Sequence, residues 1–228
     1  MLRNDDTPLP DARQADPEGL VAIGGALSPS RLIEAYRKGI FPWSEDPVTW
    51  WSPPQRAVFL PISLRLQKSL IKVLRRSDFT LTYDRAFAEV IASCACRPKN
   101  ESTWIGPVFI EGYTSLHHLG VAHSVECWQG EKLVGGLYGL AIGGLFAGES
   151  MFHRTPHASK ACLLALCHHL NRQGYDLIDS QVPNRFTLQM GARMIDRRDY
   201  LGVLKSTIDR PVHFDAPAES IAASTLLP

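Results

Sequence analysis

Apolar residues recur every three or four positions in several segments, which predicts amphipathic helices. The first helix begins at Ser28 and Pro29, a favourable N-cap followed by proline at the first helical position, and ends at Gly39. Further helices are predicted at residues 63–76, 84–94, 107–119, 155–173 and 200–204. The helices at residues 28–39, 63–76 and 84–94 carry an apolar stripe on one side, which is expected to pack against a core.

Other segments have the alternating or continuous apolar pattern of strands. These are residues 121–128, 132–141, 143–152 and 175–182. An irregular stretch rich in Trp and Pro, residues 41–61, separates them from the first helix, and we place a domain boundary near Pro61. Strands followed by a helix and a further strand predict an α+β fold: a small N-terminal domain, residues 1–61, and a larger domain, residues 62–228, with a mixed sheet flanked by helices.

Composition narrows the class of protein. The 228 residues are 45% hydrophobic and 21% charged, with a net charge of +1, so any contact with RNA must use a local basic patch. The five cysteines are odd in number and form no pair of C-x-x-C motifs, which favours free thiols in a reducing, cytoplasmic compartment over disulfides or zinc. The polar N-terminus lacks the apolar core of a signal peptide, and no apolar run approaches the ~20 residues of a membrane span. We expect no metal, no cofactor and no membrane partner.

The helix predicted at residues 63–76 has one strongly basic side. At 100° per residue, its apolar arc holds Leu66, Leu70, Val73 and Leu74. The opposite arc holds five basic residues and no acid, namely Arg65, Lys68, Lys72, Arg75 and Arg76. This arc is a candidate for phosphate contacts that do not depend on sequence, and an ordinary solvated face is the alternative.

Three polar residues are candidates for chemistry. Asp179 and Gln181 lie two apart on a predicted strand, so both side chains are expected on one face, where a carboxylate and an amide can align an amine. A structural hydrogen-bonded pair is the alternative. Glu149 follows an apolar run and needs a partner, either the cationic group of a substrate amine or a salt bridge to Arg154 or Lys160.

Eight short strings occur in a fixed order along residues 19–204. They are AIGG at 22–25, YRKGIFPW at 36–43, WWSP at 50–53, TWI at 103–105, HSVE at 123–126, GGLYG at 135–139, GESMF at 148–152 and IDSQV at 178–182. As an ordered set they closely resemble the leucyl/phenylalanyl-tRNA–protein transferases. The chain differs from the family pattern at Ala26, His153 and Ser180 and in the loop at residues 183–186.

The resemblance implies a large domain of the N-acetyltransferase (GNAT) type and an activity without ATP. Leu or Phe, and Met weakly, would be transferred from aminoacyl-tRNA to proteins beginning with Arg or Lys, which marks them for degradation by the N-degron pathway. We expect a monomer whose basic helix face contacts the acceptor stem near the 3′ end of the tRNA.

The resemblance also assigns site residues. It makes catalysis by Asp179, Gln181 and Glu149 the preferred interpretation. Asn184, just after the strand that holds Asp179 and Gln181, is a candidate to bond the terminal ribose or the substrate backbone, and a role in a turn is an equal alternative. The implied apolar pocket for the transferred side chain is formed by Trp43, Trp104, Leu137, Phe146, Leu163 and Leu166.

Two other functions are weighed against this one. A GNAT acetyltransferase would cradle the pyrophosphate of acetyl-CoA on a glycine-rich turn, and the helix predicted from residue 155 opens without a glycine. A non-catalytic tRNA-binding module would not need Glu149, Asp179 and Gln181, and all three are present.

Overall fold

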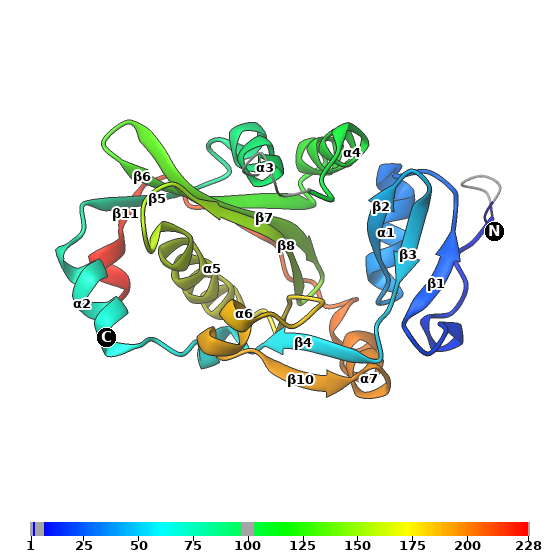
Figure 1. Cartoon of the computed structure of the whole chain (residues 1–228). Coiled ribbons are helices and arrows are strands. Elements are labelled where there is room, and N and C mark those ends of the chain that lie inside the picture. The colour runs from blue at the N-terminus through cyan, green and yellow to red at the C-terminus, as the bar shows by residue number, and fades with distance from the viewer. Residues whose placement is uncertain (1, 3–6, 97–102, 228) are drawn as a thin grey trace.

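The computed structural model describes residue 2 and residues 7–96 and 103–227. Near the N-terminus, strands β1 (Leu20–Ile23), β2 (Phe41–Glu45) and β3 (Val48–Trp51) form a small antiparallel sheet in the order β1-β3-β2. Helix α1 (Pro29–Arg37) lies beside it, and a 3-10 turn, η1 (Ala12–Gln14), precedes it (Figure 1). The Ser28 hydroxyl accepts a hydrogen bond from the Arg31 N–H and caps α1 at the position predicted from the sequence.

The prediction of an irregular stretch at residues 41–61 is wrong, because three strands lie within it. Its aromatic residues are typical of strands, and β2 and β3 pair with each other while β3 also pairs with β1. Trp50 on β3 is fully buried, and its indole N–H donates to the Gly24 carbonyl at 2.9 Å. Trp50 and the apolar residues of α1 belong to one hydrophobic core that continues into the rest of the molecule.

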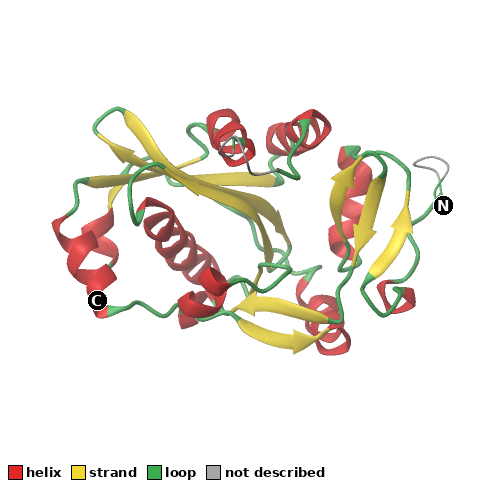
Figure 2. Cartoon of the chain, viewed as in Figure 1, coloured by secondary structure: helices red, strands yellow, loops and turns green. Residues whose placement is uncertain are grey.

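The large sheet forms the body of the molecule (Figure 2). Its strands are β4 (Gln55–Phe59), β5 (Phe79–Tyr83), β6 (Ala122–Gln129), β7 (Lys132–Ile142), β8 (Leu145–His153), β9 (Leu177–Asp179), β10 (Arg193–Asp196) and β11 (Ile221–Ala222). They run in the order β10-β4-β9-β8-β7-β6-β5-β11. The β8–β9 pair is parallel and the other pairs are antiparallel, so the α+β class with a mixed sheet is confirmed.

Helices cover both faces of the large sheet. Helices α3 (Phe87–Ala95) and α4 (Pro107–His118) lie on one face and α5 (Ala158–Gln173) on the other (Figure 1). Helix α5 connects the two parallel strands, β8 and β9, as a crossover. A Cβ atom at Gly135 would lie 2.6 Å from the Cβ of Ala158, so this glycine lets the first turn of α5 approach β7 closely.

Two predicted elements have different bounds. Helix α2 (Lys68–Arg76) is shorter than predicted, because residues 61–63 form a 3-10 turn, η2, and the chain is extended before Lys68. The last predicted helix is longer and becomes α7 (Arg197–Thr207). Helix α6 (Arg185–Met190), strand β5 and the C-terminal turn η3 (Ala223–Leu226) were not predicted.

The position of strand β4 affects where the boundary between the two domains is placed. This strand lies before Pro61, yet it pairs with β9 and β10 inside the large sheet, with Val58 opposite Asp179. The boundary at Pro61 stays a prediction. We propose that the division lies before Gln55 instead, where the chain leaves the small sheet.

Candidate active site

A buried ion pair supports the centre of the site. Asp179 ends β9 and is fully buried, and its two carboxylate oxygens accept hydrogen bonds from Arg56 Nε at 2.9 Å and Nη2 at 2.8 Å. The Arg56 guanidinium lies over the rings of Phe41 and Tyr200, at 4.7 and 4.4 Å from their centroids. The Tyr200 hydroxyl also donates to Asp179 Oδ2 at 2.8 Å. The carboxylate is therefore neutralised and fully bonded, which suits a positioning group better than a proton acceptor.

Gln181 follows the end of the strand in an unusual backbone conformation. Its φ is +53°, in the left-handed region, and its backbone N–H donates to Asp179 Oδ1 at 2.9 Å. Because β9 ends at Asp179, the prediction that both side chains share one strand face is wrong. Asp179 thus fixes the backbone of Gln181, whereas the Gln181 side-chain amide is hydrogen-bonded to Glu149.

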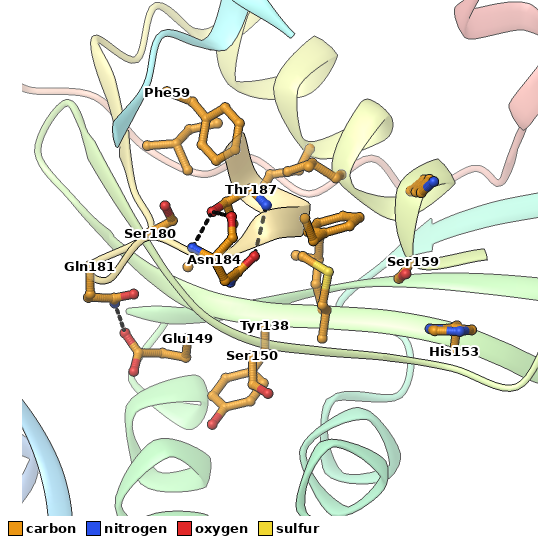
Figure 3. Close-up of a pocket in the computed structure, with 18 of the residues that line it drawn as sticks. Phe59, Tyr138, Glu149, Ser150, His153, Ser159, Ser180, Gln181, Asn184 and Thr187 are labelled. Carbon is orange, nitrogen blue, oxygen red and sulfur yellow. Dashed lines mark hydrogen bonds between the residues drawn. The ribbon is translucent and has the colours of Figure 1, made fainter. Parts of the chain in front are cut away.

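Glu149 on β8 is the residue that holds the Gln181 side chain. Gln181 Nε2 donates to Glu149 Oε1 at 2.9 Å, as Figure 3 shows, and the Tyr113 hydroxyl donates to Oε2 at 2.9 Å. The Tyr36 hydroxyl lies 2.7 Å from that of Tyr113. Glu149 does not form the salt bridge to Arg154 or Lys160 that the sequence left open as an alternative. Its carboxylate bonds to the amide of Gln181 and the hydroxyl of Tyr113 instead.

The protonation state of Glu149 determines how the amide is oriented. Removal of its carboxyl group from water raises the pKa to about 7, and the charge of Asp179 adds to this, while hydrogen bonds from Tyr36 and Tyr113 act in the opposite direction. An ionised carboxylate only accepts hydrogen bonds, so it turns the NH₂ end of the Gln181 amide toward itself. The amide carbonyl is then left for another donor, such as an attacking amine.

Two cavities meet at this group. The larger has a volume of about 740 Å³ and the smaller about 220 Å³. Five residues line both cavities, namely Trp104, Glu149, Ser180, Gln181 and Asn184. The larger cavity is bordered by apolar side chains that include Leu137, Leu163 and Leu166 of the predicted pocket, together with Phe59, Met151, Ile178 and Phe186. A site with two cavities joined at one ionisable group can hold two substrates in contact.

Three residues of the predicted site have other surroundings. Phe146 is fully buried and does not line either cavity, because its ring packs beneath the sheet against Phe214, 5.9 Å between centroids. Trp43 is 43% exposed and borders the smaller cavity but not the larger one. The Asn184 side chain accepts from the Thr187 N–H at 2.8 Å and caps α6, so it has a structural role as well as a place in both cavities.

The basic residues predicted to bind RNA are exposed, but they do not share one helix. Lys68, Lys72, Arg75 and Arg76 lie on α2. Arg65 precedes the helix, since its backbone N–H is bonded to the Met190 carbonyl at 2.8 Å in an extended segment. The prediction of five charges on one helical face is therefore wrong for Arg65.

Sequence reasoning missed Arg56, Tyr200 and Tyr113. Each contacts a site residue far away in the chain, and Arg56 is 123 residues from Asp179. Within residues 7–96 and 103–227, no group of three or more His, Cys, Asp or Glu residues could hold a metal ion. No helix in the same part of the chain is long and apolar enough to cross a bilayer.

The class of this protein is shown by its similarity to known proteins. A model of the leucyl/phenylalanyl-tRNA protein transferase family matches residues 58–205, and a model of that family's N-terminal domain matches residues 25–54. The leucyl/phenylalanyl-tRNA–protein transferase of Shewanella woodyi is 47% identical over 216 residues, covering 93% of this chain and 92% of that protein. That of Shewanella baltica is 49% identical over 208 residues, covering 90% and 88%. The chain belongs to the leucyl/phenylalanyl-tRNA–protein transferase family and is an aminoacyltransferase.

Two solved structures have a distant likeness to the chain. One is L-PGS from Bacillus licheniformis, with a TM-score of 0.44 and 12% identity, covering 79% of this chain and 70% of that one. The other is a GCN5-related N-acetyltransferase from Kribbella flavida, with a TM-score of 0.36 and 11% identity, covering 70% and 58%. Both likenesses are too weak to indicate an activity.

Proposed function

We propose that the chain transfers Leu or Phe, and Met weakly, from aminoacyl-tRNA to the α-amino group of proteins that begin with Arg or Lys, and so marks them for N-degron degradation. The observation that supports this most is the pair of cavities that share Glu149, Gln181 and Asn184. A transfer reaction needs a donor and an acceptor in contact, and the shared residues lie where the two would meet.

The larger cavity suits the aminoacyl end of the tRNA. Leu137, Leu163 and Leu166 form an apolar wall, and the volume of about 740 Å³ is sufficient for an amino acid ester of adenosine. Such a wall accepts Leu and Phe by burial of apolar surface and rejects charged side chains, which would lose their hydration there.

The smaller cavity suits the first residue of the acceptor. Its walls include Trp43 and Trp104, and Glu149 lies at its junction with the larger cavity. Aromatic faces and a carboxylate together attract a guanidinium or ammonium group. We assign the N-terminal Arg or Lys to this cavity, so Trp43 moves from the predicted donor pocket to the acceptor side.

In the reaction, the neutral α-amine of the acceptor attacks the carbonyl carbon of the aminoacyl ester. The new C–N bond forms, the bond to the ribose oxygen breaks, and the proton lost by the amine ends on that oxygen. The ester is already activated, so ATP is not required. A free α-amino group has a pKa of about 7.7–8.0, so a useful fraction is neutral near pH 7. The Gln181 carbonyl, held outward by ionised Glu149, accepts a hydrogen bond from the amine and orients it.

Asp179 acts indirectly in this scheme. Bonded to Arg56 and to the Gln181 backbone, it holds Gln181 in its left-handed conformation. Asp179→Asn and Gln181→Glu should both lower the maximal rate far more than donor binding, and the double variant should cost little beyond the worse single one.

A donor without the ribose 2′-hydroxyl separates this scheme from substrate assistance, in which that hydroxyl transfers the proton. Normal transfer from the 2′-deoxy donor supports the side-chain scheme. Loss of transfer from it, with near-normal rates in both single variants, contradicts the scheme.

Three further proposals concern partners. Lys68, Lys72, Arg75 and Arg76 contact acceptor-stem phosphates without reading sequence, and Arg65 extends this surface from outside the helix. The chain acts as a monomer in the cytoplasm. Competition among peptides that begin with Arg, Lys, Asp or Ala tests the acceptor class, and equal labelling of all four would contradict it.

A further inference from the structure

The N-terminal end of α5 borders the larger cavity with four hydrogen-bond donors. His157 is the N-cap, Ser159 and Lys160 lie in the first turn, and His153 ends the adjacent strand β8; all four line the cavity, and Figure 3 shows His153 and Ser159 at the same end of it. The backbone N–H groups of Ser159 and Lys160 have no bonded carbonyl among the described residues. First-turn N–H groups of this kind favour an anion.

Two side chains at this end each have a polar atom without a hydrogen-bond partner among the described residues. Ser159 is 5% exposed and borders the cavity, and its hydroxyl makes no hydrogen bond to any residue that the structure describes. The Nδ1 atom of His157 is also buried, and no described residue bonds to it. Because polar groups of buried residues are almost always satisfied, the unbonded Ser159 hydroxyl at the cavity wall indicates a ligand that completes it.

The charges at this end favour a negative ligand. Lys160 forms no ion pair with the carboxylates of the described residues, so its positive charge is not balanced at this end. Burial and the neighbouring Lys160 and His153 lower the pKa of His157, so its ring contributes hydrogen bonding and not charge. Glu149 is the one acidic residue among those found to line the cavity. It lies four residues from His153 on β8, a separation of about 13 Å along an extended strand.

We propose that the end of the cavity at His153, His157, Ser159 and Lys160 binds a backbone phosphate of the 3′-terminal strand of the tRNA. This rests on the proposed function, which places the aminoacyl ester at Gln181. A separation of about 13 Å exceeds the reach of the ester itself and places the anion on the nucleotide side of the donor. The phosphate accepts hydrogen bonds from the Ser159 hydroxyl, the free amides and Lys160, and so sets the distance of the ester from Gln181.

The test compares three donors that differ in phosphate content. These are 3′-O-phenylalanyl-adenosine, the same compound with a 5′-phosphate, and the cytidylyl-adenosine dinucleotide ester. For the wild-type protein, we expect one of the two phosphate-bearing donors to have a KM about tenfold below that of the nucleoside, as for hydrogen bonds to a charged group. In the double variant Ser159→Ala/Lys160→Met, the KM of the nucleoside donor divided by that of the better phosphate-bearing donor should fall to about one.

The controls distinguish a phosphate site from general charge and from misfolding. Lys132→Ala removes an exposed lysine elsewhere on the surface and should keep the tenfold ratio. An unchanged melting temperature shows that the double variant is folded. Equal KM values for all three donors in the wild-type protein, or a full ratio in the double variant, would overturn the phosphate site.

Inhibition by coenzyme A at concentrations that match the best donor would assign the site to a pyrophosphate and overturn the assignment to tRNA. A wild-type protein that transfers from none of the donors, aminoacyl-tRNA included, contradicts the proposed function, whereas transfer from all donors with equal KM contradicts the phosphate site alone.

Discussion

The sharpest consequence of the site geometry is a specific pH dependence of Glu149→Gln. The pKa of Glu149 is raised to about 7, so about a tenth of it is ionised at pH 6 and about nine-tenths at pH 8. If ionised Glu149 orients the Gln181 amide, this change contributes about a tenfold rise in rate between the two pH values. The acceptor amine also loses its proton over this range, and that contribution is the same in both proteins.

The readout is therefore the quotient of wild-type and Glu149→Gln single-turnover rates, measured from pH 6 to pH 8 with one donor and one acceptor. We expect this quotient to rise about tenfold, with a midpoint near pH 7. Titration of either substrate cancels in the quotient, so the midpoint belongs to Glu149. A quotient that stays constant with pH would refute the role given to ionised Glu149, however low the variant's activity is.

Stability gives an independent check on the same group. The folded-state pKa lies above the ordinary value of 4.5, so folding favours protonated Glu149. Its contribution to stability is present below pH 4.5 and is lost as the pH rises through about 7. Glu149→Gln should therefore be more stable than the wild type at pH 8, on the order of 1–2 kcal/mol after allowance for contact with cavity water, and not at pH 5. A melting temperature of Glu149→Gln that exceeds the wild-type value at pH 5 but not at pH 8 would contradict a raised pKa of Glu149.

Three further predictions concern the ion pair, the cavity and the basic helix. Arg56→Met leaves Asp179 buried without a counter-ion and should cost about 3–5 kcal/mol in the free energy of unfolding, partly recovered in Arg56→Met/Asp179→Asn; denaturant titration checks both. Leu163→Phe should narrow the larger cavity and lower transfer of Phe relative to Leu by on the order of tenfold in kcat/KM, and an unchanged ratio would remove Leu163 from the pocket. Lys72→Ala/Arg76→Ala should weaken tRNA binding and reduce its salt slope by about 2, while equal loss with an aminoacyl-nucleoside would exclude a phosphate contact.

Local signals in the sequence predict the helices well and the strands unevenly. Ser28 and Pro29 mark the start of α1 because capping depends on neighbouring residues alone. Strand β4 was missed because its partner is distant: it pairs with β9, more than a hundred residues further along the chain. A Trp- and Pro-rich sequence gives no sign of such a partner. Strands β2 and β3 pair with each other and were missed because prolines and a short turn interrupt their apolar pattern.

The site shows the same division between local and distant signals. The ordered strings identify Glu149, Asp179 and Gln181, and the structure brings them together. The alternation of side chains along a strand predicted Gln181 beside Asp179 on one face. The positive φ at Gln181 instead directs its side chain to Glu149. No residue type in the string IDSQV indicates such a turn. Arg56 could not be predicted either, because an arginine in a strand is ordinarily a surface residue.

The central claim is that this chain moves an amino acid from tRNA to the N-terminus of a protein. The most direct measurement incubates the protein with [¹⁴C]Phe-tRNA or [¹⁴C]Leu-tRNA and a peptide that begins with Arg, without ATP, and follows the label. We expect label on the α-amino group of the peptide, and none on a matched peptide whose N-terminus is acetylated. Label that stays on the tRNA with both donors, in a protein that is folded, would contradict it.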